Sequence, residues 1–380
     1  MLVFTSVTKS YIPKARVLAR SLKQHHPTWD FQLVLSDELP AHFDLREEPF
    51  DGVLSIKELG ISDWRRWAFG HSIVELCTAV KGPAASVFMR RSGVDKIMYL
   101  DPDIKIFSSL AELEMALDEH DVLLTAHLLD PEVDDRAIRD NEISALKHGV
   151  FNLGFFAARN GGQGRDFVEW WSRRLLKYCM ADIPKGLFTD QRWCDLAPCF
   201  FDRLFILRDR GYNAATWNLA HRRISRDSAG AYYAGDVALR FYHFTGYDSG
   251  AGETMLERYA SDQPASRELW EDYASDLRSC NHGDPAYADW AFGHFDNGEA
   301  IPSEARRVYR SRPDLQSAFP NPFATKGDSF LAWWTSQIGQ ATDGAAGSSG
   351  LICGLVRRLT STICKHRPVL SAGQKRRDMA

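Results

Sequence analysis

The stretch that most constrains this chain is residues 96–103, KIMYLDPD, an apolar run that ends in two carboxylates one residue apart. An apolar run of this length next to turn residues predicts a strand buried in a sheet. Side chains alternate along an extended segment, so we expect Asp101 and Asp103 to point the same way. An open α/β sheet keeps its ligand crevice at the carboxyl ends of its strands. Two carboxylates aimed at such a crevice indicate a divalent cation, which prefers oxygen ligands and can share them with a diphosphate.

Composition sets the outer limits. The chain has 380 residues, of which 44% are hydrophobic and 25% charged, which predicts one large folded domain and a smaller accessory part. A net charge of −4 gives no reason to expect nucleic acid as a partner. The seven cysteines form no Cys-x-x-Cys pair, which favours free thiols in a reducing compartment. The chain opens as a core strand with no signal-peptide pattern, and no apolar stretch is long enough to span a bilayer, so we expect a cytoplasmic protein.

Strand and helix patterns alternate through about the first 125 residues. We expect strands at residues 3–6, 31–36, 53–56, 96–100 and 121–126, and helices from Pro13, over 64–80, near 84–91 and at about 110–117. This order is typical of an α/β fold, in which helices cover both faces of a mostly parallel sheet. The polar segment from residue 127 to 148 then interrupts the pattern, and it fits either an acceptor-side lid or a mobile surface loop with a short helix.

Three further polar features follow. Asn152 and Gly154 lie in a predicted strand at residues 150–160, where the glycine indicates either a structural kink or close approach of a ligand. Asp190 and Gln191 lie at a helix start and could simply cap it. His243 ends a last core strand at residues 239–244, where a lone histidine is usually just a hydrogen-bonded side chain.

Taken in order, these features resemble the family 8 type of retaining glycosyltransferases, which have the GT-A fold. The resemblance covers roughly residues 1–250 and rests on Tyr11 after the first strand, YLDPD at 99–103, FNLG at 151–154, DQ at 190–191, WN at 217–218 and HFTG at 243–246. It implies that Asp101, Asp103 and His243 hold Mn²⁺ or Mg²⁺. Mixed oxygen and imidazole ligation suits Mn²⁺ somewhat better.

The resemblance also implies roles for the other motif residues. The donor nucleotide would lie against Thr5 and Ser6, with Tyr11 stacked on the base. The donor sugar would be lined by Asn152 and Gly154, and its reacting face by Asp190 and Gln191. The remaining expected donor contacts are Gly246 of the histidine motif and a cation just before the acidic strand, either Lys81 or Arg90.

Three positions depart from the family pattern. The lysine that normally follows the histidine motif, and would touch a diphosphate oxygen, is missing, because the chain runs GYDS at 246–249. The donor-sugar motif has Leu153 between its asparagine and glycine, which leaves the donor open. Residue 192 is an arginine where the family has another acid.

The implied function is transfer of a hexose-type sugar, with retention of configuration, from a nucleotide diphosphate donor such as a UDP-sugar to a glycan or lipid-linked glycan acceptor. Two alternatives stay open. One is a catalytically silent subunit that binds sugar nucleotides or acts as a scaffold in polysaccharide assembly. The other is a phosphatase of the haloacid-dehalogenase type, although such enzymes carry the Asp-x-Asp motif on their first strand.

The chain is expected to divide into three parts. Residues 1–250 would form the nucleotide-sugar-binding catalytic domain, residues 251–343 a helical accessory subdomain for the acceptor, and residues 344–380 a linker with a basic amphipathic tail. Part of the accessory segment resembles bacterial polysaccharide glycosyltransferases. The tail fits either peripheral contact with the inner face of the cytoplasmic membrane, or a helix packed on its own domain or a disordered end.

Overall fold

The structure, a computed structural model, describes residues 1–281 and 283–342, with side chains described to residue 338. The chain forms two compact units, one made of residues 1–64 and 73–292, the other of residues 65–72 and the segment from 293 onward. The predicted linker and basic tail at 344–380 lie outside the described residues.

The first unit is built on a seven-stranded sheet with the order β10-β6-β7-β4-β1-β2-β3. β7 runs antiparallel to both of its neighbours, β4 and β6, and the other neighbouring strands pair in parallel. The mostly parallel α/β sheet expected from the sequence is therefore confirmed. The strands are β1 Leu2–Val7, β2 Asp30–Leu35, β3 Gly52–Ser55, β4 Lys96–Leu100, β6 Val122–Ala126, β7 Phe151–Arg159 and β10 Leu204–Leu207.

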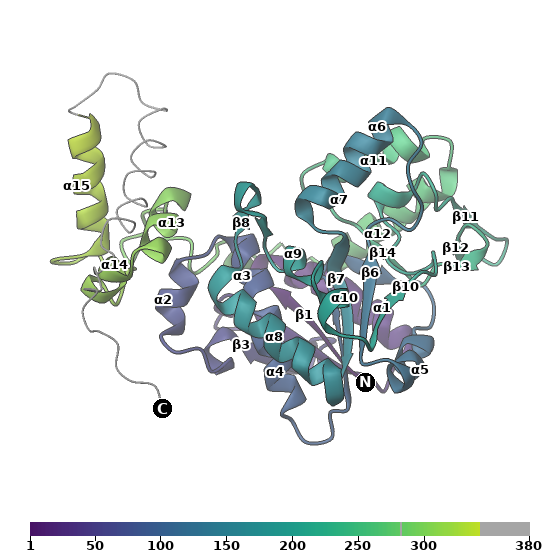
Figure 1. Ribbon diagram of the computed structural model, residues 1–380, viewed down its shortest axis with the longest axis horizontal. Coiled ribbons are helices and arrows are strands. Elements are labelled where there is room, and N and C mark those ends of the chain that lie inside the picture. The colour runs from purple at the N-terminus through teal and green to yellow at the C-terminus, as the bar shows by residue number, and fades with distance from the viewer. Residues whose placement is uncertain (282, 343–380) are drawn as a thin grey trace, which may run out of the picture. The chain divides into compact units, whose positions relative to one another are not determined.

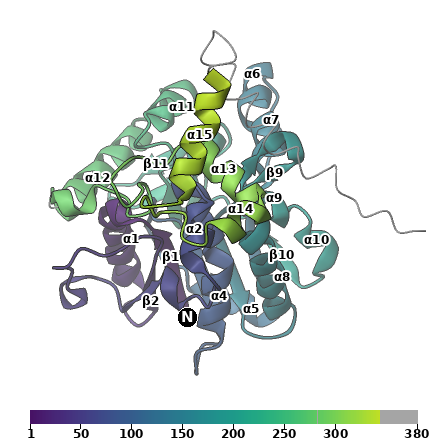
Figure 2. The same cartoon turned by 90° about the vertical axis from the view of Figure 1, so that its left-hand side faces the viewer.

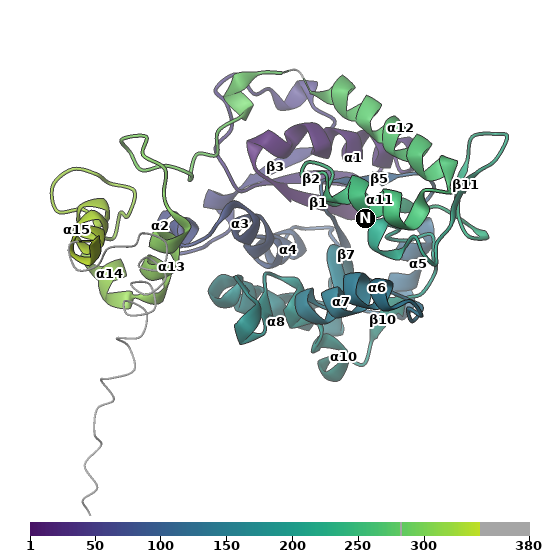
Figure 3. The ribbon, with the colours of Figure 1, turned by 90° about the horizontal axis from the view of Figure 1, so that it is seen from above.

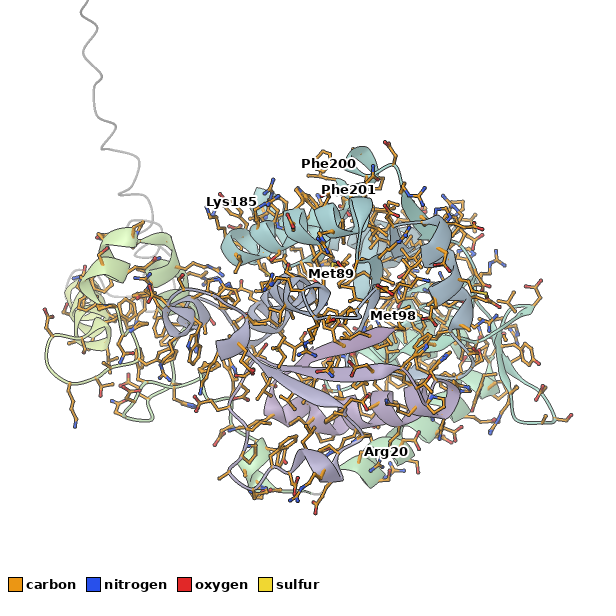
Figure 4. The ribbon with its side chains drawn as sticks, turned by 90° about the horizontal axis from the view of Figure 1, so that it is seen from below. Arg20, Met89, Met98, Lys185, Phe200 and Phe201 are labelled. Atoms are coloured by element: carbon orange, nitrogen blue, oxygen red, sulfur yellow. The ribbon has the colours of Figure 1, made fainter. Side chains whose placement is uncertain are left out.

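Helices cover both faces of this sheet (Figures 1 and 3). One layer contains α1 (Ile12–His25) and α12 (Pro264–Cys280), and the opposite layer contains α4 (Lys81–Met89) and α8 (Gly162–Tyr178). Figure 4 shows Arg20 of α1 on one side of the sheet and Phe200 and Phe201, which follow α8 in the chain, on the other. All six residues of β1 are buried, because both faces of the strand are covered.

The strand order reverses between β1 and β4. From β1 the chain moves to β2 and β3 on one side and then returns to place β4 on the other side. Ligands of open α/β sheets bind at this kind of reversal, beyond the carboxyl ends of the strands. The end of β4 is followed by β5 (Ile104–Ile106), which pairs antiparallel with β14 (Phe241–His243).

Two helix predictions need correction. The expected helix at residues 64–80 is two helices, α2 (Trp64–Phe69) and α3 (Ile73–Ala79), separated by a break that begins at Gly70. Glycine commonly ends a helix, and the Gly70 amide closes the last turn on the Trp67 carbonyl. The long helix α8 is absent from the sequence-based prediction, although its buried residues recur at helical spacing.

The segment from residue 127 to 148 is folded. It contains α6 (Asp135–Ala137), a π-helical turn at Ile138–Glu142 and α7 (Ile143–His148). Asp140 in the π-helical turn accepts hydrogen bonds from Arg258 and Tyr259 of α11 (Ala251–Ala260). π-Helical turns often lie at functional sites, and this one is fixed to a neighbouring helix.

Shorter elements complete the first unit. The helices are α5 (Ala111–Glu119), α9 (Gln191–Cys194) and α10 (Ala197–Phe200), and the remaining strands are β8 (Ala181–Asp182), β9 (Leu187–Phe188), β11 (Ile224–Arg226), β12 (Tyr232–Ala234) and β13 (Val237–Ala238). α11 and α12 pack in this unit, although both lie beyond residue 250. The boundary that the sequence predicts at residue 250, between a catalytic domain and an accessory subdomain, is a functional one and stays a prediction.

The second unit packs around Phe69. The ring of Phe69 contacts Phe295, Tyr309, Phe323 and Phe330 at centroid distances of 5.0–5.9 Å. Tyr309 of α13 (Ser303–Ser311) also contacts Phe330 of α15 (Phe330–Thr342), and the Tyr309 hydroxyl donates to the Phe319 carbonyl directly after α14 (Pro313–Ala318) (Figure 2). The helical C-terminal extension expected from the sequence is therefore present. Among residues 1–281 and 283–342, no helix has both the length and the apolar character needed to cross a membrane.

Close packing of α4 on α8 gives a stability prediction. A Cβ atom added at Gly82 would lie 2.7 Å from the Cα atom of Ser172, and backbone atoms cannot move aside as a flexible side chain can. We expect Gly82→Ala to lower the free energy of unfolding by about 1–3 kcal/mol in urea titrations. Gly161→Ala, where the added Cβ meets no atom within 4 Å, is the control. Equal stability of the two variants would contradict this packing.

Candidate active site

The two carboxylates are brought together by a tight turn. The Ile104 amide donates to the Asp101 carbonyl at 3.1 Å, which closes a β-turn with Pro102 at its second position. The prediction that Asp101 and Asp103 lie on an extended segment is therefore wrong. Proline favours such a turn because its ring fixes φ near the value that the second position needs. The turn, and not strand alternation, sets the spacing of the two acids.

His243 is brought to these acids by strand pairing. β14 lies antiparallel to β5, and His243 is opposite Ile104 in the register. The Phe244 amide donates to the Asp103 carbonyl at 2.8 Å and fixes the end of the pairing. A residue far away in the sequence thus reaches the acidic turn through backbone hydrogen bonds.

The three side chains form a compact ligand set. One ligand atom each from Asp101, Asp103 and His243 lies within 4.8 Å of the other two. His243 Nε2 is 3.1 Å from Asp103 Oδ1 and 3.7 Å from Asp101 Oδ2. Ligands that share one dication at bond lengths of roughly 2.0–2.6 Å can be this far apart. Two carboxylates and one imidazole therefore fit an ion such as Mn²⁺ or Mg²⁺.

Charge shapes the protonation of this set. Burial disfavours charge on both Asp103 and His243, but their mutual attraction outweighs it. The pKa of Asp103 is lowered to about 2, and the pKa of His243 is raised above its usual value. A protonated His243 thus partly neutralises Asp101 and Asp103, which a metal ion would otherwise neutralise.

Asn152 orients His243. Its Oδ1 atom lies 3.3 Å from His243 Nδ1 and accepts hydrogen bonds from Asn213 Nδ2 at 3.1 Å and from the Gly154 amide at 3.2 Å. An Nδ1–H that donates to an amide oxygen leaves Nε2 for a metal, which is how second partners commonly fix ligating histidines. The resemblance implied a contact of Asn152 with the donor sugar, and the structure gives it this positioning contact.

Gly154 allows the histidine to approach β7. A Cβ atom at this position would lie 2.6 Å from His243 Cε1 and 2.7 Å from Asn152 Oδ1. β7 changes register against β6 between Phe151 and Phe156, which agrees with the kink predicted at this glycine, whereas the close approach predicted for a ligand is made by a side chain of the protein. The approaching group is the imidazole of the ligand set.

Lys81 is a buried counterion. Its ammonium lies 2.8 Å from Asp190 Oδ2 and 3.2 Å from Asp101 Oδ1, and it donates to the Leu153 carbonyl at 2.9 Å. Burial opposes its charge, but the attraction of Asp101 and Asp190 raises the pKa of Lys81 well above its usual value. With all of these oxygens around it, Lys81 holds the acidic residues together. Arg90, the other cation considered, is exposed and lines a separate cavity with Arg165.

The backbone directly before Asp190 is strained. Thr189, directly before it, has a φ of +43°, a conformation that costs a β-branched residue energy and is often found at functional sites. The Thr189 hydroxyl donates to Asp190 Oδ1 at 3.0 Å. Gln191 Nε2 donates to the His148 carbonyl at 2.8 Å, which leaves the amide oxygen of Gln191 available to a ligand.

A cavity of about 390 Å³ opens over this set. Asp101, Asp103 and His243 lie in its wall, together with Asn152, Gly154, Asp190 and Gln191. The predicted residues from four parts of the sequence therefore meet at one cavity. The remaining wall comes from α3, the segment 127–148, β7, the end of β9, the turn at Trp217 and the turn after β14. It consists of Val74, Thr78, His127, Asp140, Asn141, Ser144, Ala145, His148, Leu153, Phe188, Thr189, Trp217 and Thr245.

His127 is a further residue of the cavity wall, and no sequence motif indicates it as a site residue. Its Nε2 atom lies 3.2 Å from Asn152 Nδ2, and its ring packs edge-on against Trp217. Burial lowers the pKa of His127 to about 4, so it stays neutral where His243 titrates. The sequence offers one indication of this role: His127 directly follows β6, and β6 is the neighbour of β7, the strand that carries Asn152.

The other predicted donor contacts, Thr5, Ser6, Tyr11 and Gly246, lie outside the wall of this cavity. Ser6 is buried, and its hydroxyl donates to the Cys77 carbonyl at 2.7 Å and lies 3.0 Å from the hydroxyl of Tyr99, which in turn donates to Asp101. Thr5 is fully buried in β1. Tyr11 is 37% exposed, and its hydroxyl donates to Asp248. Gly246 forms a turn after β14 with a φ of +73°.

The raised pKa of His243 gives a pH prediction. A proton on Nε2 competes with a metal ion, so Mn²⁺ affinity should fall as the pH drops through the raised pKa of His243, by about tenfold per pH unit below it. Electron paramagnetic resonance titrations of free Mn²⁺ from pH 5.5 to 8.5 measure this. In His243→Gln the affinity should be weaker and nearly independent of pH. A flat profile in the parent protein would contradict the ligand assignment.

The contact of Asn152 gives a second prediction. Asn152→Leu removes the acceptor of His243 Nδ1 but leaves the three ligands, and we expect Mn²⁺ affinity to fall about 10- to 100-fold in the same titration. Asn160→Leu, which changes an asparagine directly after β7, should leave Mn²⁺ affinity within about twofold once the folded fraction is matched. Unchanged affinity in Asn152→Leu would show that the ring needs no such partner.

Comparisons with known proteins give distant similarities. No family model matches the sequence. The chain is 25% identical over 250 residues to the uncharacterized protein YfnD of Bacillus subtilis strain 168, covering 64% of this chain and 76% of YfnD. It is also 25% identical over 183 residues to the uncharacterized protein YfnF of the same strain, covering 47% of this chain and 56% of YfnF.

Among solved structures, the chain is similar to the galactosyltransferase LgtC in complex with donor and acceptor sugar analogs. The identity is 14%, the TM-score is 0.45, and the match covers 76% of this chain and 99% of LgtC. It is also similar to the glycosyltransferase GlyE of Streptococcus pneumoniae, with 18% identity, a TM-score of 0.39, and coverage of 73% of this chain and 62% of GlyE. At these identities and TM-scores the likenesses carry no conclusion about activity.

Proposed function

We propose that this chain is a metal-dependent glycosyltransferase that moves a hexose-type sugar from a nucleotide diphosphate, UDP in the first instance, to a glycan or lipid-linked glycan acceptor. One observation carries the proposal. Asp101, Asp103 and His243, from separate parts of the chain, meet in the wall of one cavity where the strand order of the sheet reverses. This is the arrangement that the resemblance to GT-A glycosyltransferases implied.

The chemistry follows from charge. Cleavage at the anomeric carbon leaves negative charge on the diphosphate, and a dication held by Asp101, Asp103 and His243 would supply the charge that stabilises it. Asn152 keeps the His243 ring in the orientation that ligation requires. Lys81 offsets the repulsion between Asp101 and Asp190, so the wall keeps its shape before a ligand arrives.

Asp190 and Gln191 would act at the reacting face of the sugar. Asp190 is buried with Lys81 and lies between the strained residue Thr189 and Gln191, the first residue of α9. The amide oxygen of Gln191 can stabilise the positive charge that develops at the anomeric carbon. No protein nucleophile is required if the acceptor attacks from the side that the diphosphate leaves, and retention of configuration results.

Residues beyond the ligand set suit the nucleotide base and the acceptor. The half-exposed ring of Tyr11 is available to stack on the nucleotide base. Asp140, Ser144 and His148, in the folded segment 127–148, give the cavity a polar wall for acceptor hydroxyl groups. A cytoplasmic location and membrane contact through the tail remain predictions.

A donor panel tests the proposed function. UDP-glucose, UDP-galactose and UDP-N-acetylglucosamine are incubated with the protein and Mn²⁺, with and without added glycan acceptors, and release of UDP is measured. We expect turnover with at least one donor, and a loss of about 100-fold or more in Asp103→Asn, because a metal ligand is removed. Asp118→Asn changes an exposed carboxylate on α5 and should keep the parent rate.

The outcomes separate the alternatives. Binding of a donor without turnover under any condition would favour the silent sugar-nucleotide-binding subunit. Release of phosphate from a phosphomonoester, with all intact donors ignored, would favour the haloacid-dehalogenase type of phosphatase. Equal rates in the parent and Asp103→Asn would contradict a metal-dependent transfer.

A further inference from the structure

Lys14 in the first turn of α1 carries a buried ammonium with spare hydrogen-bonding capacity. Its side chain is 6% exposed. Among the residues that the structure describes, its one hydrogen-bond acceptor is Asp248 Oδ2 at 2.6 Å, and its ammonium also lies 4.3 Å from the ring centroid of Tyr11 and 5.8 Å from that of Tyr247. An ammonium has three N–H donors, and burying donors without partners costs free energy. The Lys14 ammonium therefore has N–H donors that could bind a second anion.

Lys81, a second buried lysine of the same unit, has more oxygen partners than Lys14. Three oxygen atoms surround it within 3.2 Å, two from carboxylates and one from the Leu153 carbonyl. The charge of Lys81 is thus already paired with carboxylates of the protein, Asp101 and Asp190. Lys14 has a single carboxylate partner, and that partner, Asp248, is half exposed to solvent.

The position of Lys14 connects it to the ligand set. The turn that follows His243 brings Thr245 into the cavity wall and, three residues later, brings Asp248 onto Lys14. The Phe244 amide fixes the start of this turn to the Asp103 carbonyl. The effect is also electrostatic: although burial opposes it, the pKa of Asp103 is lowered to about 2 by His243 and, to a smaller degree, by the charge of Lys14.

Charge balance shows why a further cation is needed. A dication cancels the charges of Asp101 and Asp103, and Lys81 is already paired with Asp190. A nucleoside diphosphate would still bring about three negative charges that the ligand set cannot neutralise. Burying such charges without partners is unfavourable. The site therefore requires a positive side chain near Asp103 whose present partner can be displaced.

We propose that Lys14 binds the diphosphate of the nucleotide ligand and that Asp248 is a resident counterion which the diphosphate displaces. This inference rests on the proposed function and assigns one residue of its binding site. Asp248 can give way because it lies between Gly246 and Gly250, both in left-handed conformations with φ of +73°. Tyr11, whose hydroxyl also donates to Asp248, would be released by the same exchange.

The ammonium would also compensate for a departure in the sequence. The lysine that the resemblance leads one to expect after the histidine motif is missing, and Tyr247 and Asp248 occupy that turn. Asp248 brings to the turn a cation from α1, more than 230 residues away in the sequence. The positive charge is thus supplied from another element.

Two variants with opposite expected effects test this proposal. Both Lys14→Met and Asp248→Asn break the same ion pair. Lys14→Met removes the cation, so it should weaken binding of the nucleoside diphosphate about tenfold or more. Asp248→Asn removes the competing carboxylate, so diphosphate binding should be retained or tightened. Lys14→Arg keeps the charge and should restore most of the affinity lost in Lys14→Met.

Equilibrium dialysis with labelled ligands gives the measurement. UDP, GDP and dTDP are screened on the full chain with Mn²⁺, and the tightest binder is compared with its nucleoside in each variant. Circular dichroism melting confirms that the variants are folded. Loss of diphosphate affinity in Lys14→Met, with nucleoside affinity within about twofold of the parent and no loss in Asp248→Asn, is the expected result.

Other results overturn the inference. If both variants weaken diphosphate binding alike, the Lys14–Asp248 pair is a structural tie. If Lys14→Met changes nothing, or lowers diphosphate and nucleoside affinity equally, Lys14 is not a diphosphate ligand. A parent protein that binds none of the three diphosphates would instead contradict the proposed function, which keeps the two failures distinct.

Discussion

Repulsion among buried carboxylates is the constraint on which the site depends. Asp101, Asp103 and Asp190 all lie in the wall of one cavity, and acids this close in a partly desolvated site raise one another's energy unless cations are near. The protein supplies Lys81 between two of them and His243 beside the third. The remaining negative charge favours a dication. Strand order, the Asp101–Ile104 turn and the close approach at Gly154 can all be understood as ways to assemble this balance.

Backbone pairing provides the precision that side chains alone would not. The pairing of β5 with β14 carries His243 to the acidic turn, and the same pairing sets the start of the turn that holds Lys14 through Asp248. Rigid strands thus position the metal ligands, whereas a glycine-flanked turn carries the counterion that a ligand can displace. A binding site needs both properties, because ligation demands fixed geometry and charge exchange demands movement.

Much of this arrangement could be predicted from the sequence, and the rest depended on tertiary contacts. Apolar runs fixed most strands of the sheet, and the order of the motifs identified Asp101, Asp103 and His243 as residues that meet. The turn at Pro102 was mistaken for extended chain because local apolar pattern outweighed turn chemistry. His127 and the positioning contact of Asn152 could not be predicted, since both depend on which side chains face each other across neighbouring strands. The sequence gives no indication that Lys14 is buried, because its partner Asp248 is more than 230 residues away in the chain.

The central claim is that an imidazole and two carboxylates share one dication. Pulsed electron paramagnetic resonance of bound Mn²⁺ tests it most directly, because a directly coordinated imidazole nitrogen produces a characteristic nuclear modulation. The account predicts nitrogen modulation in the parent protein and its loss in His243→Gln, with a phosphorus coupling that appears when a nucleoside diphosphate is added. Mn²⁺ that binds tightly at a single site with no nitrogen modulation in the parent would contradict the account.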